Sequence, residues 1–109
     1  MSELAAAHCE ECTPGTPPLP EEEAAALSTQ VPDWERDATR ALRREFSFPN
    51  FRDAFGFVAQ VALIAEAEGH HPDIELGWGR AGFELTTHAA SGLTRNDFVL
   101  AAKIDRLAA

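Results

Sequence analysis

The segment from Asn50 to Gly69 constrains the fold more than any other part of the chain. Asn50 belongs to the residue types that cap helix N-termini, Asp53 stands where a capping-box partner would, and Gly69 ends the pattern. Between these ends, apolar residues recur at helical spacing: Phe51, Ala54, Phe55, Val58, Val61, Ala62 and Ala65. This pattern predicts a long core helix. Phe57 and Ile64 lie outside the stripe, which indicates a second face covered by another element or subunit.

Two segments with strand-like alternation follow this helix. Ile74, Leu76 and Trp78 alternate with Glu75 and Gly77, and then Phe83, Leu85 and Thr87 alternate with Glu84, Thr86 and His88. Alternation with a period of two is typical of strands that bury one face. We therefore expect two strands joined by a turn around Gly79 to Gly82, with His88 on the face opposite Phe83.

Three further elements are predicted outside this central part. In the segment RALRREFSF, residues 40–48, Leu42, Arg44, Phe46 and Phe48 alternate with more polar residues, which predicts a strand, although its start is equally compatible with a helix. Pro20, three glutamates and the run AAAL predict a short helix that ends near Gln30. Thr94 and Asp97 form a second capping-box pattern before the helical segment FVLAAKIDRLAA.

Residues 1–18 lack such patterns and contain Pro14, Pro17 and Pro18. Proline removes a backbone donor and restricts the backbone angles, so we expect residues 1–18 to form a flexible arm and residues 19–109 to form the folded domain. The chain of 109 residues has the size of one small domain. The order helix, strand region, helix, two strands, helix predicts an α+β domain with its helices on one face of a sheet.

The composition argues against several classes of partner. The 18 acidic and 9 basic side chains give a net charge of -9, which repels phosphate backbones and anionic lipids. No segment approaches the roughly 18 consecutive apolar residues of a membrane-spanning helix, and the N-terminus lacks the features of a signal peptide. We therefore expect a cytoplasmic protein that binds neither nucleic acid nor membranes.

Cys9 and Cys12 form the motif CEEC within the predicted arm, and His8 is adjacent. Such a pair can act as a redox centre or as half of a zinc site. Tetrahedral zinc requires about four protein ligands, and the sequence has no second CxxC or HxxxH motif to supply them. A surface segment without metal is the favoured interpretation.

Three of the four histidines lie near the ends of predicted elements, His70 and His71 after the long helix and His88 after the second strand. Pro72 favours extended backbone angles at His71, so the two adjacent rings should point in different directions. If the strands pair, the three imidazoles can meet at one end of the sheet and exchange protons with a ligand. The spacing alone does not separate such a site from ordinary surface or capping histidines, which are more common.

The same residues carry a resemblance to a known family. Glu66, His70, His71, Pro72, Trp78, His88 and Asp97 occur in an order and spacing that resemble the signature of the pterin-4a-carbinolamine dehydratases. The segments REFSFPNF, AEAEGHHPDI, LTTH, GLTRNDF and LAAKID are also similar to that family, so the resemblance covers residues 19–107. Gly69 and the glycine-rich segment GWGRAG depart from the pattern, and the CEEC arm carries none of the signature.

The resemblance implies an antiparallel four-stranded sheet with three helices packed on one face, in the order α-β-β-α-β-β-α. It also implies a hydro-lyase that removes water from 4a-hydroxytetrahydropterin to give the quinonoid dihydropterin, in support of tetrahydrobiopterin recycling for an aromatic amino acid hydroxylase. No metal and no bound cofactor are implied. His70, His71 and His88 would be catalytic, and the substrate-binding residues would be Glu66, Pro72, Trp78, Thr86, Thr87 and Asp97.

Several alternatives stay open beside these assignments. Asp97 can be a capping residue only, Glu66 a solvent-exposed helix residue and Trp78 a core residue. Family members form dimers or dimers of dimers, so we expect a homodimer or a homotetramer. The alternative function is that of a non-enzymatic relative, a factor that assists Rubisco assembly or the dimerisation of transcription factors. The intact histidines favour the enzyme.

Overall fold

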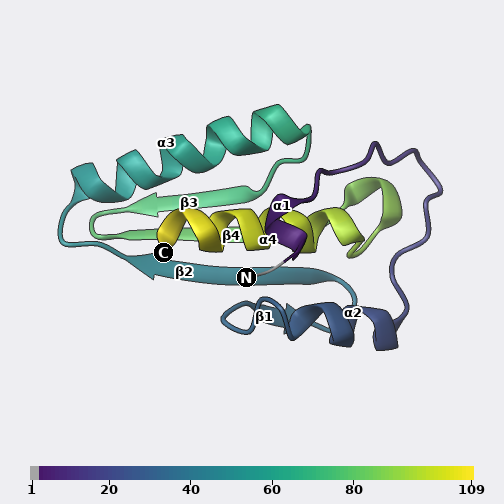
Figure 1. The fold of residues 1–109 in the computed structure, drawn as a ribbon. Helices are drawn as coiled ribbons and strands as arrows, with labels where there is room; N and C mark the ends of the chain where they lie inside the picture. Colours follow the sequence, from purple (N-terminus) through teal and green to yellow (C-terminus); the bar gives the residue numbers. More distant parts are fainter. Residues whose placement is uncertain (1–2) are drawn as a thin grey trace.

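The computed structural model describes residues 3–109 and contains one antiparallel sheet covered by helices (Figure 1). The strands are β1 (Glu35–Asp37), β2 (Ala41–Ser47), β3 (Asp73–Gly77) and β4 (Arg80–Leu85), arranged in the order β1-β2-β4-β3. The long helices are α2 (Glu21–Ser28), α3 (Phe51–Glu68) and α4 (Arg95–Ala108). The predicted α+β class and the order α-β-β-α-β-β-α are therefore confirmed.

Helix α3 has the predicted ends but buries a different stripe. The Asn50 side chain accepts a hydrogen bond from the amide of Asp53 at 2.8 Å, as expected for an N-terminal cap. The buried residues of α3 are Ala54, Phe57, Val61 and Ala65, whereas Phe51 and Phe55 of the predicted stripe are exposed. The predicted stripe was therefore wrong about Phe51, Phe55 and Ala62, which are exposed, whereas Phe57 is covered by the rest of the chain, as expected for a second face.

An aromatic cluster joins α3 to the sheet. The ring of Phe57 lies 5.0 Å from that of Phe46, 5.3 Å from that of Phe48 and 5.8 Å from that of Phe83. Tilted and edge-on arrangements at these distances are favourable for aromatic pairs beyond the apolar area that they bury. The cluster fixes α3 against β2 and β4, and thereby fixes the direction in which the chain leaves the helix toward residue 70.

The hairpin of β3 and β4 turns earlier than predicted. Gly77 pairs with Arg80, so Trp78 and Gly79 alone form the turn, and Gly79 has a φ of 72° that favours glycine. Gly82, which the sequence placed in the turn, lies within β4 opposite Glu45 and Glu75. The turn therefore lies at the opposite end of the hairpin from Leu85. The chain after β4 continues from the end of the sheet that lies away from this turn.

The N-terminal segment differs from the expected flexible arm. Residues 1 and 2 lie outside the described residues, but Glu3–Ala6 form a helical turn, α1, that packs against α4. Leu4 and Ala5 belong to the hydrophobic core. Residues 7–19 then follow the surface back to α2 without regular structure, in agreement with their prolines. Within residues 3–109, no helix combines the length and apolar character needed to cross a membrane.

Candidate active site

The end of α3 positions two of the three candidate histidines. The helix stops at Gly69, whose left-handed φ of 67° lets the chain turn without the steric cost that other residues have. Pro72 follows two residues after His70, and β3 begins at Asp73. This short link sends the rings of His70 and His71 toward two different carboxylates, so the predicted divergence of the two rings is confirmed.

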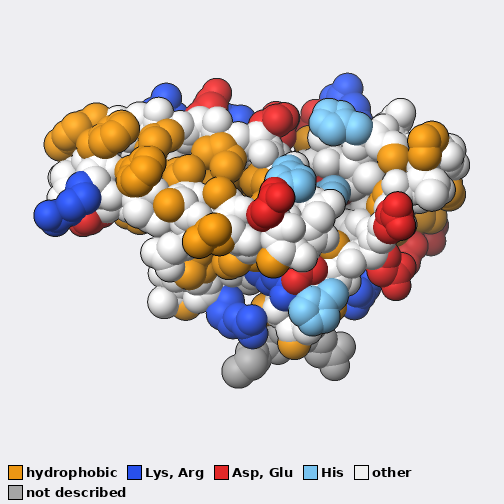
Figure 2. All heavy atoms as spheres, turned by 90° about the horizontal axis from the view of Figure 1, so that it is seen from above, with side chains coloured by type: hydrophobic (Ala, Val, Ile, Leu, Met, Phe, Trp, Pro, Cys, Tyr) orange, Lys and Arg blue, Asp and Glu red, His pale blue; other side chains and the backbone are white. Residues whose placement is uncertain are grey.

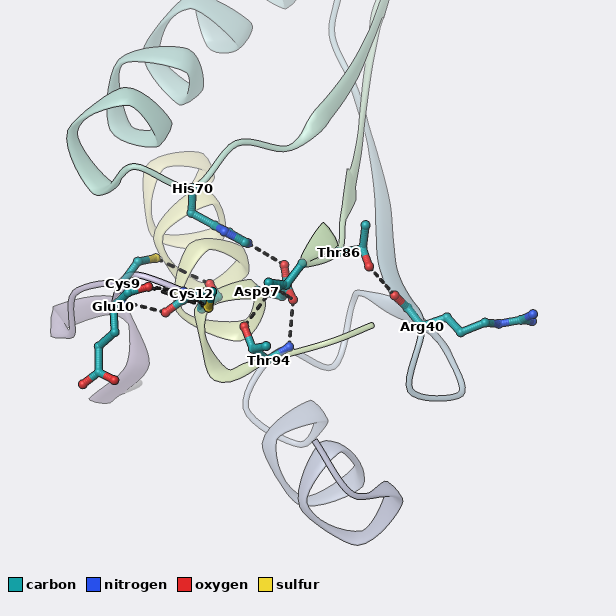
Figure 3. A network of polar contacts seen from close by, with 10 residues as sticks. Cys9, Glu10, Cys12, Arg40, His70, Thr86, Thr94 and Asp97 are labelled. Carbon is teal, nitrogen blue, oxygen red and sulfur yellow. Dashed lines mark hydrogen bonds and ion pairs between the residues drawn. The ribbon is translucent and has the colours of Figure 1, made fainter. Parts of the chain in front are cut away.

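The ring of His70 binds a buried carboxylate (Figure 3). Its Nε2 lies 2.6 Å from Oδ1 of Asp97, whose side chain is 0% exposed, and the His70 side chain is 12% exposed. The second oxygen of Asp97 accepts hydrogen bonds from the Thr94 amide at 2.9 Å and from the Thr87 hydroxyl at 2.8 Å. Asp97 is therefore the N3 residue of the capping box of α4 and the hydrogen-bond partner of His70 at the same time.

The hydrogen bond to Asp97 assigns different roles to the two nitrogens of His70. An ionised carboxylate only accepts hydrogen bonds, so Nε2 carries a proton when Asp97 is ionised. Nδ1 is then the nitrogen of His70 that can exchange a proton with a ligand. A carboxylate that fixes the orientation and tautomer of an imidazole is a recurring part of acid–base sites.

The ring of His71 binds a carboxylate at the surface. Its Nε2 lies 2.8 Å from Oε1 of Glu66, with the two side chains 58% and 80% exposed. Water competes for both groups at such exposure, so this pair constrains the ring less than Asp97 constrains His70. The side chain of Glu66 is solvent-exposed, as the plainer interpretation proposed, but it also contacts a candidate catalytic histidine.

His88 lies on a helical turn and not on a strand. β4 ends at Leu85, and His88–Ala90 form a 3-10 turn. The prediction was wrong because Thr87 and Gly92 pair with each other, with amide–carbonyl distances of 3.0 and 3.3 Å, and so close a loop that ends the alternation. The imidazole of His88 is exposed at the start of this loop.

One cavity of about 290 Å³ brings the three histidines together. It is lined by Glu10, Glu11, Cys12, Gly69, His70, His71, Thr86, Thr87, His88, Ala89 and Asn96. A cavity of this size with several convergent polar groups can hold a small heterocyclic ligand. Thr86 is fixed at its wall because its hydroxyl donates to the Arg40 carbonyl at 2.6 Å. The predicted meeting of the histidines at one end of the sheet is confirmed.

The remaining predicted site residues fall into two groups. Glu66 and Asp97 are absent from the cavity lining but bind the histidines that line it. Pro72 lies in the link between α3 and β3, next to His71. Trp78 lies in the β3–β4 turn, at the far end of the hairpin from the cavity, and its side chain is largely exposed. Trp78 does not line this cavity.

Besides Gly69 and Ala89, which adjoin predicted site histidines, four lining residues were missed by the sequence analysis: Glu10, Glu11, Cys12 and Asn96. The first three come from the segment that was expected to be a flexible arm. Their partners lie far along the chain, so no local pattern places them. Asn96 follows the capping Thr94 in GLTRNDF, a segment that does resemble the family, and this resemblance was the one available signal.

A second hollow lies on the outer face of the sheet and has a volume of about 320 Å³. It is lined by Glu35, Arg36, Asp37, Ala41, Arg43 and Glu84. Arg43 lies 3.1 Å from Glu75 and 4.0 Å from Glu84, so its charge is already matched by neighbouring carboxylates. Exposed ion pairs of this kind are common on protein surfaces, and no histidine among the described residues lines this hollow. The histidine cavity is therefore the candidate site.

The cysteines do not complete a metal site within the described residues. No group of three or more His, Cys, Asp or Glu side chains among residues 3–109 is arranged to hold a metal ion. Both cysteines are free. His8, the nearest histidine in the sequence, binds Glu68 through Nδ1 at 2.9 Å.

The family model described as pterin 4 alpha carbinolamine dehydratase matches residues 17–107. A protein of Rubrobacter xylanophilus is 52% identical over 107 residues, which cover 98% of this chain and 100% of that protein. A protein of Methylococcus capsulatus is 50% identical over 107 residues, which cover 97% of this chain and 94% of the relative. Both carry the provisional name of pterin-4-alpha-carbinolamine dehydratase.

A solved structure has the same fold. The crystal structure of a transcriptional coactivator/pterin dehydratase from Brucella melitensis superposes with a TM-score of 0.78 and is 35% identical in sequence. The match covers 84% of this chain and 99% of the other.

Proposed function

Because this chain belongs to the pterin-4a-carbinolamine dehydratase family, we propose that it dehydrates 4a-hydroxytetrahydropterin to the quinonoid dihydropterin. The observation that carries the proposal is the cavity lined by His70, His71 and His88, with His70 oriented by a buried carboxylate. The substrate would be formed by an aromatic amino acid hydroxylase in the same cytoplasm, and the product would return to the tetrahydropterin pool.

The reaction requires two proton transfers and no change in the total number of electrons. The bond between C4a and its hydroxyl oxygen breaks, and the oxygen takes a proton and leaves as water. The ring nitrogen next to C4a loses its proton, and its electron pair forms the new double bond to C4a. A general acid and a general base are therefore needed, and imidazole performs both tasks near neutral pH.

We assign the general acid to His70. The leaving hydroxyl is attached to a tetrahedral carbon, so the acid must approach it from one fixed direction. His70 meets this requirement best because Asp97 holds its ring at 2.6 Å and leaves Nδ1 for the proton transfer. His88, across the cavity from the end of α3, would accept the ring proton directly or through water. His71 would bind the edge of the pterin beside His70.

The test is a direct assay of dehydration. Purified protein is added to freshly generated 4a-hydroxytetrahydropterin, and the loss of its absorbance is compared with the rate in buffer. His70→Ala and His88→Ala should each reduce kcat by about 10²- to 10⁴-fold. Arg52→Ala, a change of an exposed side chain on α3, serves as the control and should leave the rate unaffected. A wild-type rate equal to the buffer rate would show that the proposal is wrong.

One observation favours a second candidate, a protein-binding role. Figure 2 shows hydrophobic side chains gathered over α3, where Phe51, Phe55 and Leu63 are exposed. Exposed apolar patches mark interaction surfaces, and the Brucella melitensis protein is described as a transcriptional coactivator/pterin dehydratase. The patch also suits the expected homodimer or homotetramer. Phe55→Asp separates the roles: it should weaken protein binding or oligomerisation, whereas His88→Ala should reduce turnover alone.

A further inference from the structure

Residues 8–12, which we name the strap, cross the end of α4 next to the cavity (Figure 3). Both the oxygen and the nitrogen of the Asn96 side-chain amide bind the backbone of Glu10. The Glu10 amide donates to Asn96 Oδ1 at 2.8 Å, and Asn96 Nδ2 donates to the Glu10 carbonyl at 2.6 Å. The Asn96 side chain is itself buried. Because a buried side-chain amide needs hydrogen-bond partners, these two hydrogen bonds hold the backbone of Glu10 in position.

A second anchor holds the other end of the strap. Glu68, in the last turn of α3, accepts a hydrogen bond from the Cys9 amide at 2.7 Å and lies 2.9 Å from Nδ1 of His8. Lys103 of α4 lies 3.7 Å from the same carboxylate and donates to the Ala5 carbonyl at 3.0 Å. The strap is therefore bound to α3 and α4 together, at the place where the two helices meet.

The second anchor is nearly buried and charged. The side chains of Glu68 and Lys103 are 9% and 10% exposed. Burial opposes ionisation of Glu68, but the Cys9 amide, His8 and Lys103 outweigh burial, so the pKa of Glu68 lies below its ordinary value. Buried charges require such partners. In the part of the chain that the structure describes, every hydrogen bond of the Glu68 carboxylate goes to the strap, so the strap helps Lys103 to keep this carboxylate ionised.

The docked strap completes the cavity. Glu10, Glu11 and Cys12 form part of its lining, together with residues from the end of α3 and from the loop after β4. The backbone also continues along that loop, because the Gly15 amide donates to the Ala89 carbonyl at 3.3 Å. Without the strap, the histidines would face solvent on this side.

We propose that the strap is a substrate-binding wall of the active site, and that its anchors, Asn96, Glu68 and Lys103, set the affinity for the pterin. This inference rests on the proposed function and adds a positioning task for three residues that take no part in the proton transfers. A wall that excludes water and restricts the ligand affects binding more than the chemical step.

The kinetic test uses two changes that release the strap without altering a histidine. Lys103→Met removes the ammonium group that pairs with Glu68 in the second anchor. Glu10→Pro removes the backbone amide hydrogen that binds the side chain of Asn96. Glu10→Ala is the matched control for the second change, because it loses the same carboxylate and keeps the amide. We expect Lys103→Met relative to wild type, and Glu10→Pro relative to Glu10→Ala, to raise KM about tenfold, in line with the loss of one or two hydrogen bonds, with kcat within about twofold.

Thiol labelling reports strap docking independently of turnover. Burial raises the pKa of the Cys9 thiol to about 12, with contributions from the charges of Glu68 and Asp97, so Cys9 should react slowly with iodoacetamide while the strap is docked. In Lys103→Met and Glu10→Pro, the labelling of Cys9 should become at least about tenfold faster. In the wild type, 7,8-dihydrobiopterin should protect Cys12, which lines the cavity.

The outcomes separate this proposal from the proposed function. If the wild type does not turn over the carbinolamine but dihydrobiopterin protects Cys12, the dehydratase assignment is wrong and the strap still forms a pterin-binding wall. If Cys9 labelling accelerates in Lys103→Met while KM stays within about twofold of wild type, the strap does not contribute to binding and the proposal is overturned. Unchanged labelling of Cys9 in both variants would equally overturn it, because the anchors would not hold the strap.

Discussion

The pair His70–Asp97 and the pair His71–Glu66 come from adjacent histidines, but they lie in opposite environments. The first is buried, with Asp97 0% exposed and bound to two further donors, and the second is on the surface with both side chains more than half exposed. Ion pairs with these two geometries differ in what their loss costs. We therefore expect a change at His70 or Asp97 to affect the proposed catalysis and the stability of the fold together, and a change at His71 or Glu66 to affect the two separately.

The largest effect is expected for Asp97→Ala, which should destabilise the fold and remove activity together. The change leaves the Thr94 amide and the His70 ring without their acceptor, and leaves the Thr87 hydroxyl with the Thr94 hydroxyl alone. Removing one partner of a buried, hydrogen-bonded charge costs about 3–5 kcal/mol. Urea unfolding followed by circular dichroism measures this loss of unfolding free energy.

Asp97→Asn is the matched control for this change. It keeps the shape and one acceptor oxygen, so it should be more stable than Asp97→Ala while still reducing kcat, because an amide holds the ring of His70 less firmly. If Asp97→Ala lowered the unfolding free energy by less than about 1 kcal/mol, Asp97 would not link the cap of α4 to the site in the way described.

His70→Ala should have the next largest effect, a loss of kcat of about 10²- to 10⁴-fold with secondary structure retained. The change removes the proposed acid and leaves Asp97 with its two remaining donors. His70→Gln is the informative companion, since its amide can still bind Asp97 but cannot transfer a proton. The assay of carbinolamine loss measures both variants. Equal rates for His70→Gln and wild type would transfer the acid role to another residue.

His71→Ala should reduce kcat/KM by about tenfold, less than the loss at His70, because a neighbouring imidazole remains and the exposed ring is less firmly held. The effect should appear mainly in KM, in keeping with a role at the pterin edge. Steady-state kinetics at several substrate concentrations separates the two parameters. A larger loss at His71 than at His70 would reverse the assigned roles and contradict the comparison.

The sequence predicts those parts of the site that depend on local signals. Asn50 and Gly69 mark both ends of α3, because capping and a left-handed stop are properties of a few neighbouring residues. The divergence of His70 and His71 follows from Pro72 for the same reason. Thr94 and Asp97 likewise reveal the start of α4. The resemblance to a family then supplied the expected role of the histidines.

The parts that could not be predicted depend on contacts between distant residues. His88 was placed on a strand because its alternation with Phe83 continues past Leu85, and the pairing of Thr87 with Gly92 that ends the strand is a feature of the closed loop. β1 has three residues and no apolar alternation, so only its pairing with β2 defines it. The strap was expected to be a flexible arm, since its partners at Glu68 and Asn96 lie 59 and 86 residues away.

The smallest effect is expected for Glu66→Gln. This substitution is the sharpest test of the exposed pair His71–Glu66. The side chain is 80% exposed, and an exposed ion pair contributes about 0–1 kcal/mol to stability, so the unfolding free energy should change by no more than that. A glutamine can still accept a hydrogen bond from His71, so kcat/KM should fall by no more than about threefold, which corresponds to about 0.65 kcal/mol and lies within that range. Glu66→Gln and Asp97→Asn replace a carboxylate by its amide in the same way, and the two should therefore differ because Asp97 is buried and accepts two further hydrogen bonds. If both variants lost similar activity and stability, the environment of the carboxylate would not decide how strongly each histidine depends on its partner.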